Sequence, residues 1–291
     1  MKEIETYKEV VPLYLVDAFT EEPFKGNPAA VCILKSSYPT SVLQTIAAEM
    51  NLSETAFLHN PEKKSLKESK IFSLRWFTPK VEMPLCGHAT LASAAVLFYD
   101  VVVSMNEIVF ETMSGRLTAK KKKESVILNF PAGDLSPISP PPEFLNALGV
   151  ADYEDARYCR ETGNFLIILP DEKTLRGLEP NFELMKAAPA KEKIRGVIIT
   201  SPGHPPYDFV SRYFAPWIGI NEDPVTGSAH TTLALYWSKK LGKREMLAFQ
   251  ASPRGGTLTV RLHPNNDRVD LIGKAVIVSK GELYIPSKLL R

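Results

Sequence analysis

Residues 82–99 read EMPLCGHATLASAAVLFY, and this stretch predicts a helix at the centre of a domain. From residue 89 onwards nearly every position is apolar, and only Thr90 and Ser93 interrupt the run with small polar groups. A helix without a polar face is a buried helix. We therefore expect residues 89–99 to be enclosed by the strands of their domain.

A second stretch of the same kind lies in the other half of the chain. Residues 222–237 read EDPVTGSAHTTLALYW and align with the first stretch at an offset of 140. They predict a second buried helix over residues 229–237. The basic residues Lys239 and Lys240 that follow suit the negative end of a helix.

Three further matches link the two halves. Residues 75–79 (RWFTP) recur as residues 212–216 (RYFAP), and Gly26-Asn27 recurs as Gly163-Asn164, both at an offset of 137. Residues 114–118 (SGRLT) match residues 255–259 (GGTLT) at an offset of 141. Four matches in one order, with a nearly constant offset, predict an internal duplication.

The length of 291 residues favours two domains. Residues 136–142 (SPISPPP) can hold neither a helix nor a central strand, so we expect domains over residues 1–134 and 135–291. An alternative for the final strand, near residues 283–285, is that it packs back onto the first domain. The predicted fold class is α/β (α+β), with two pseudo-symmetric domains. Each is a curved mixed β-sheet or barrel around a central helix, and a helix over residues 41–50 covers the outside of the first.

Composition and charge limit the function classes. Lysine and arginine number 35 against 33 acids, and the net charge of +2 gives no reason to expect nucleic acid as a partner. Three cysteines do not make a disulfide framework, and the first twenty residues lack an apolar signal region, so we expect a cytoplasmic protein without a membrane segment. No nucleotide-binding motif occurs, and four of the histidines (His59, His204, His230, His263) show no metal-ligand spacing. We expect neither cofactor nor metal.

Both buried helices begin at corresponding motifs, and each start carries a glycine, Gly87 or Gly227. A helix start has unpaired backbone N–H groups and a partial positive charge, and glycine lets a ligand come close to that backbone. If pseudo-symmetry turns the two starts toward each other across a cleft between the domains, they would hold a carboxylate and stabilise an enolate. The alternative is two ordinary helix starts with glycines for tight turns.

The two motifs also differ. Cys86 aligns with Thr226, so a racemase that needs a thiolate on each face of its substrate is not expected. His88 aligns with Ser228. Position alone leaves two interpretations open for Glu54, Asp223 and His88. Either they are functional residues, or Glu54 is a solvated cap or ion-pair partner, Asp223 a turn or helix-capping carboxylate and His88 a capping or hydrogen-bonded histidine.

At these residues the sequence resembles the PhzF family, which shares the diaminopimelate epimerase-type fold. The resemblance rests on residues 26–31 (GNPAAV), 51–55 (NLSET), 75–79, 86–90 (CGHAT) and 222–229 (EDPVTGSA). It implies a homodimer, and animal members of the family have been described as binding a WD-repeat protein. By resemblance the catalytic residues are Glu54 as acid and base, with His88, Asp223 and Ser228 as partners, and the substrate-binding residues are Gly87, Cys86, Thr226, Gly227 and Asn27.

The expected function is a cofactor-independent isomerase in which one glutamate moves a proton between carbons of a small carboxylate-bearing substrate. Two alternatives stay open. One is a two-base racemase that uses Cys86 with Glu54 or Asp223. The other is a non-catalytic interaction protein of the same family.

Overall fold

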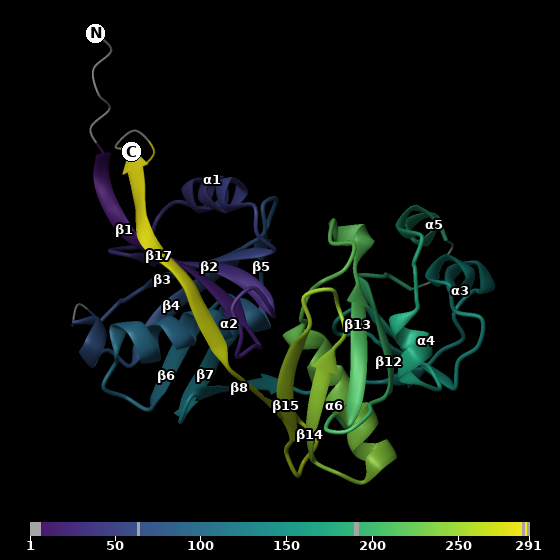
Figure 1. Ribbon diagram of the computed structural model, residues 1–291. Helices are drawn as coiled ribbons and strands as arrows, with labels where there is room; N and C mark the ends of the chain where they lie inside the picture. The colour runs from purple at the N-terminus through teal and green to yellow at the C-terminus, as the bar shows by residue number, and fades with distance from the viewer. Residues whose placement is uncertain (1–6, 63–64, 189–191, 287–288, 290–291) are drawn as a thin grey trace. The chain divides into compact units, whose positions relative to one another are not determined.

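Two compact units make up the computed structural model, which describes residues 7–62, 65–188, 192–286 and 289 (Figure 1). Unit 1 comprises Met1–Leu128 and Gly273–Arg291, and unit 2 comprises Asn129–Ile272. The sequence prediction placed one boundary at 134/135. In the structure the chain passes between the units twice, at 128/129 and at 272/273.

Unit 1 is built on a mixed sheet in the order β17-β1-β2-β3-β4-β6-β7, with β8 beside β7. The pairs β2–β3 and β4–β6 are parallel, and the other neighbours are antiparallel. Its strands are β1 (Tyr7–Ala18), β2 (Asn27–Leu34), β3 (Glu54–His59), β4 (Ile71–Phe77), β5 (Glu82–Met83), β6 (Glu107–Thr112), β7 (Gly115–Lys122), β8 (Ser125–Pro131) and β17 (Ala275–Pro286).

The last strand of the chain belongs to unit 1. β17 runs antiparallel to β1, with partners from Ala18↔Ala275 to Tyr7↔Pro286. Figure 1 shows the two strands side by side, one purple and one yellow. Because β1 also pairs with β2, the strand pairing joins residues from both ends of the chain in one sheet.

The predicted central helix of unit 1 is present as α2 (Gly87–Ala95), and all nine of its residues are buried. Its two small polar side chains bond within the helix, since Thr90 donates to the carbonyl of Cys86 and Ser93 donates to that of Ala89. The helix contacts β1, β2, β3 and β17. Beyond α2 the chain widens into a π-helical segment, η2 (Val96–Val101), which ends where Val102 takes a left-handed conformation.

The predicted outer helix is α1 (Thr40–Met50). Its apolar face carries Val42, Leu43, Ile46 and Ala47, which pack in one cluster with Phe57 and Phe77 of the sheet. A short 3-10 turn, η1 (Leu66–Glu68), precedes β4. None of the helices in the described ranges is both long and apolar enough to cross a membrane.

Unit 2 has its own mixed sheet, in the order β9-β10-β11-β12-β13-β14-β15-β16. Here β11–β12 and β13–β14 are parallel and the other neighbours are antiparallel. The strands are β9 (Ser136–Pro137), β10 (Asp155–Cys159), β11 (Asn164–Ile168), β12 (Gly196–Pro202), β13 (Phe209–Phe214), β14 (Glu245–Gln250), β15 (Gly256–Leu262) and β16 (Arg268–Gly273).

The second predicted buried helix is α6 (Gly227–Leu241). It runs one turn further than predicted because Gly242, with φ of +66°, supplies the left-handed cap that ends it. On the sheet's other face, Val210 and Phe214 join an apolar cluster with Phe144 and Leu175. The remaining helical segments of unit 2 are α3 (Pro142–Leu148), α4 (Glu172–Arg176), α5 (Phe182–Ala187) and the 3-10 turn η3 (Pro216–Ile218).

The two units share their order of strand pairings. From β1 to β8 and from β10 to β16 the sequence is antiparallel, parallel, antiparallel, parallel, antiparallel, antiparallel. The repeated motif also makes the same ion pair in each unit, since Arg75 binds Glu82 and Arg212 binds Glu222 through two guanidinium nitrogens each. Both findings agree with the predicted duplication, which stays a prediction.

Burial of α2 leads to a prediction about stability. Leu91 lies at the middle of α2 and is fully buried, so Leu91→Ala should lower the free energy of unfolding by about 2–5 kcal/mol. Met113→Ala is the matched control, because Met113 is 67% exposed in the turn between β6 and β7 and its truncation leaves no cavity. Denaturant unfolding measures both. Equal effects of the two substitutions would contradict a buried central helix.

Candidate functional site

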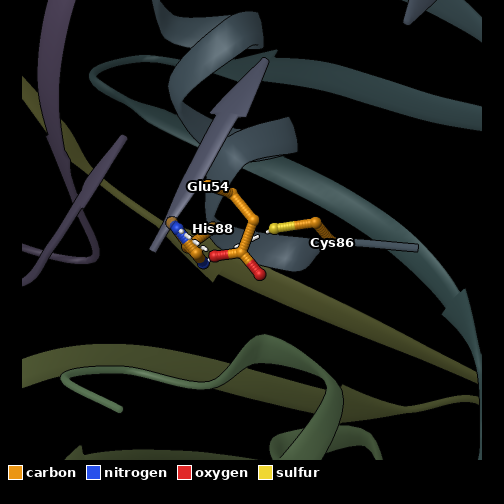
Figure 2. Close-up of side chains that lie close together, drawn as sticks. All are labelled: Glu54, Cys86 and His88. Atoms are coloured by element: carbon orange, nitrogen blue, oxygen red, sulfur yellow. Dashed lines mark hydrogen bonds and ion pairs between the residues drawn. The ribbon is translucent and has the colours of Figure 1, made fainter. Parts of the chain in front are cut away.

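The start of α2 brings three reactive side chains together. Cys86 is the N-cap residue of α2, His88 follows two residues later, and Glu54 is the first residue of β3, opposite Ala29 of the parallel strand β2. Nε2 of His88 lies 3.3 Å from Oε2 of Glu54, and Nδ1 lies 3.6 Å from Sγ of Cys86. Figure 2 shows the three side chains pointing toward one another. Each is at least nine-tenths buried.

His88 is a neutral imidazole at neutral pH. Burial lowers the pKa of His88 to about 3, because the low-dielectric surroundings disfavour its charged form. The contact with Glu54 is therefore an approach of 3.3 Å between a neutral ring nitrogen and a carboxylate oxygen, and not a full ion pair. His88 is also too weak a base to take a proton from a substrate carbon near neutral pH.

Ser53 determines which nitrogen of His88 carries the hydrogen. Its hydroxyl donates to Oδ1 of Asn27 at 3.1 Å, and its oxygen lies 3.4 Å from Nε2 of His88. The Ser53 hydroxyl has the acceptors Asn27 and Pro28 at 3.1 and 3.4 Å for its proton, so we assign Nε2 as the donor and Ser53 as the acceptor. Nε2–H then faces both Ser53 and Glu54, and Nδ1 is left to accept from the thiol of Cys86.

Asn27 connects the start of β2 to this network. It is fully buried, and it follows Gly26, whose φ is +64°. A Cβ at Gly26 would come within 2.2 Å of the carbonyl oxygen of Ala18, so only glycine fits this turn. The predicted site residue Asn27 is thus connected to His88 through Ser53. Ser53 itself received no predicted role, although it stands next to Glu54 in the motif of residues 51–55.

The start of α6 in unit 2 has a different network. Asp223 accepts a hydrogen bond from the hydroxyl of Thr226, the N-cap residue. Gln250, at the end of β14, accepts from the backbone N–H of Thr226 at 2.8 Å and donates to the carbonyl of Asp223 at 2.7 Å. Gln250 is fully buried and was not predicted, because a lone glutamine at a strand end has no distinctive pattern. The network fixes the backbone before Gly227 and Ser228.

The predicted site residues therefore fall into two groups. The structure brings Glu54, Cys86 and His88 together directly and adds Asn27 through Ser53. In unit 2 it brings Asp223 and Thr226 together at the start of α6, where Gly227 and Ser228 are the first two helical residues. The expectation that both groups serve one substrate stays a prediction.

At the start of α2 and of α6, the side chain of the N-cap residue does not accept from the backbone N–H groups of the first turn. Neither Cys86 nor Thr226 uses its side chain to cap its helix, although both have the extended backbone of an N-cap residue. The positive end of α2 therefore adjoins the carboxylate of Glu54 and the predicted backbone-binding residue Gly87. Such an end is suited to an anionic ligand group.

Glu54, Cys86 and His88 also have the chemistry of metal ligands. Each offers one ligand atom, and these atoms all lie within 4.8 Å of one another. The sequence did not indicate this set, because Glu54 comes from a different element and the group has no metal-binding spacing.

The protonation state of His88 can be tested by nuclear magnetic resonance. With ¹⁵N-labelled histidine, the His88 ring should stay in its neutral Nε2–H form from about pH 8 down to about pH 5, because its pKa lies near 3. The unfolded chain should titrate near pH 6.5. As pH falls below about 6.5, the unfolded state takes up the proton before the folded state does. His88 should therefore lower the folding stability in acid. Titration of folded His88 near pH 6.5 would contradict a buried, neutral His88 beside Glu54.

Comparison with known proteins gives consistent matches over nearly the whole chain. Residues 16–281 match the family PhzC-PhzF, described as phenazine biosynthesis-like protein. The chain is 47% identical over 285 residues to phenazine biosynthesis-like domain-containing protein 1 of Mus musculus, covering 94% of this chain and 99% of the mouse protein. It is 47% identical over 277 residues to an uncharacterized isomerase of Halalkalibacterium halodurans, covering 94% and 98%. The crystal structure of a PhzF family phenazine biosynthesis protein from Enterococcus faecalis superposes with a TM-score of 0.86 at 44% identity, covering 95% and 100%.

Proposed function

The chain belongs to the PhzC-PhzF family, and from this membership we propose that it is an isomerase in which Glu54 moves a proton between two carbons of a small carboxylate-bearing substrate. The mixed α+β fold is the diaminopimelate epimerase-like fold of the family. Family and fold support an isomerase or epimerase-type function. The single-glutamate mechanism, without a cofactor, is the proposal.

The observation that carries the proposal is the contact between Glu54 and a neutral His88. A proton shuttle must be ionised when it takes the proton and protonated when it returns it. Nε2 of His88 lies 3.3 Å from Oε2 of Glu54, and a ring with a pKa of about 3 does not compete for the proton near neutral pH. Glu54 is therefore the group of this trio best suited to cycle a proton near neutral pH.

The proposed reaction has two steps that balance without an added reagent. A C–H bond next to the substrate's unsaturated or carboxylate-bearing carbon breaks, its proton goes to Glu54, and its electron pair delocalises as an enolate. The proton then returns from Glu54 to another carbon of the same system, and the double bond shifts. The backbone N–H groups at the start of α2, including that of Gly87, would stabilise the enolate charge.

The proposal extends to Asp223 and Ser228 on the strength of the motif in residues 222–229. The buried hydrogen bonds of Gln250 hold the backbone around Asp223 and Thr226 in one conformation, as a binding residue requires. We propose that Asp223 and Ser228 orient substrate, with Thr226 and Gly227 as backbone-binding positions. Asp223→Asn should then lower turnover while the fold is retained.

The two-base racemase requires Cys86 as a thiolate. Nδ1 of His88 lies near the thiol, but an imidazole with a pKa of about 3 is too weak a base to remove its proton. The thiol is accordingly assigned as an S–H donor to Nδ1. This favours the single-carboxylate mechanism over the thiol-based one.

The non-catalytic alternative, an interaction protein that binds a WD-repeat partner, makes a separate prediction. Substitutions at the buried Glu54 and His88 should leave such an interaction unchanged, because their side chains are only 10% and 5% exposed. The proposed homodimer, taken from the family resemblance, is likewise independent of these residues.

Glu54→Gln is the principal test of the proposed function. Glutamine keeps the size and hydrogen-bonding reach of the side chain but cannot cycle a proton, so turnover should fall by about 10²–10⁴-fold. The thermal midpoint and carboxylate binding should change little. Glu49→Gln is the matched control, since Glu49 is exposed on α1 of the same unit. Normal turnover by Glu54→Gln would exclude the single-carboxylate mechanism.

Cys86→Ser tests the thiol-based alternative. The substitution keeps a small donor beside Nδ1 of His88, so the proposal expects most of the activity and the fold to remain. Steady-state kinetics on a racemisable or isomerisable carboxylate measures this. A loss as large as that of Glu54→Gln would support the two-base racemase instead.

A further inference from the structure

We propose that Glu54, Cys86 and His88 form a binding site for Zn²⁺, and that zinc in this site blocks the reactive carboxylate. The three ligand atoms lie within 4.8 Å of one another at the start of α2. A thiolate, an imidazole nitrogen and a carboxylate oxygen are the three protein ligand types that zinc takes. The metal site rests on this geometry alone, and only the inhibition rests on the proposed function.

The distances are close to those of a zinc site. Tetrahedral zinc, with bonds of about 2.0–2.3 Å, places its ligand atoms roughly 3.3–3.7 Å apart. The side chains already approach at these lengths, with 3.3 Å between Glu54 and His88 and 3.6 Å between Cys86 and His88. These two contacts use different nitrogens of His88, so binding requires the carboxylate to swing toward the nitrogen beside Cys86. One ligand atom from each of the three residues already lies within 4.8 Å of the others, so the rearrangement is confined to these side chains.

Ser53 selects the nitrogen that would hold the metal. Its oxygen lies 3.4 Å from Nε2, which is assigned as the donor, and the Ser53 hydroxyl donates to Asn27 at 3.1 Å. A metal-bound histidine almost always donates its other N–H to such a partner. Nδ1, which faces Cys86, is therefore free of a proton and is the zinc ligand.

Charge balance favours zinc in this buried position. A lone charge is costly where side chains are less than one-tenth exposed. Zn²⁺ with one thiolate and one carboxylate forms a set without net charge. The positive end of α2 disfavours a cation, but it also stabilises the thiolate that binding creates at its N-cap.

The donor set also predicts selectivity. Three protein ligands leave a fourth position of a tetrahedron for water or a substrate carboxylate. Mg²⁺ and Ca²⁺ prefer sites made of oxygen, so they should not compete. Co²⁺, which takes the same ligands as zinc, is a suitable spectroscopic probe.

The experiment titrates metal-free protein with Co²⁺ under anaerobic conditions and follows the thiolate-to-cobalt charge-transfer absorption. The expected result is one cobalt per chain, displaced by Zn²⁺ but not by Mg²⁺. Cys86→Ser should abolish the charge-transfer band, and Glu54→Gln should weaken cobalt binding by at least about tenfold. Ser53→Ala should weaken it by about 10–100-fold, the usual effect of removing a partner that orients a metal-bound histidine.

Cys159→Ser is the matched control. Cys159 is also a buried thiol beside a carboxylate, with Sγ 3.4 Å from Oδ1 of Asp134, but the described contacts give it no imidazole partner. This substitution should leave the cobalt spectrum unchanged. The proposal is overturned if wild type binds no cobalt, if the band persists in Cys86→Ser, or if it disappears in Cys159→Ser. Should Cys86→Ser fail to fold, unchanged cobalt affinity in Glu54→Gln overturns it equally.

Activity measurements separate this inference from the proposed function. Zinc that binds with the expected spectrum should inhibit turnover, and a chelator should restore it. Binding without inhibition would keep the metal site and contradict the role of Glu54. Loss of turnover in Glu54→Gln without any metal binding would contradict the zinc site and keep the isomerase.

Discussion

A helix with no polar face imposes the main constraint on unit 1. Because all nine residues of α2 are buried, the sheet has to cover the helix on every side, and β1, β2, β3 and β17 all contact it. Only its ends can meet a ligand. The requirement to bury α2 therefore leaves its N-terminus for the proposed chemistry, where Cys86 and His88 lie beside Glu54 of β3.

The buried helices and the groups at their starts could be predicted from the sequence, because continuous apolar runs and repeated motifs are local signals. Glu54 and His88 came from the motifs, and the structure places them in contact. Ser53 and Gln250 could not be predicted, since their roles depend on partners that are distant in the sequence, such as Asn27 and Thr226. The extra turn of α6 and the π-helical end of α2 depend on backbone conformation at Gly242 and Val102, which apolar patterns do not encode.

The two units differ at the strand position of Glu54, the proposed acid and base. By strand register against β4 and β13, Gly196 in unit 2 takes the position of Glu54 in unit 1, since Thr55 pairs with Phe77 and Val197 pairs with Phe214. The space that a side chain at Gly196 would need is filled by the hydroxyl of Tyr213, which donates to Asn164. Unit 2 thus keeps the asparagine that matches Asn27 but has a tyrosine hydroxyl in place of the carboxylate. Two nearly identical sets of strand pairings thus carry a carboxylate at this strand position in unit 1 and a glycine in unit 2.

The pairing of β1 with β17 has a consequence for how the protein is made. Residues 129–272 are inserted, as a complete unit, between two parts of unit 1. On the ribosome, unit 2 can form as soon as its own strands have emerged, whereas the sheet of unit 1 lacks β17 until the segment that follows unit 2 is synthesised. β1 is thus translated before unit 2 and β17 after it, so the sheet of unit 1 is completed later than the sheet of unit 2. Until β17 pairs with it, β1 is an edge strand whose unpaired backbone groups can pair with other chains.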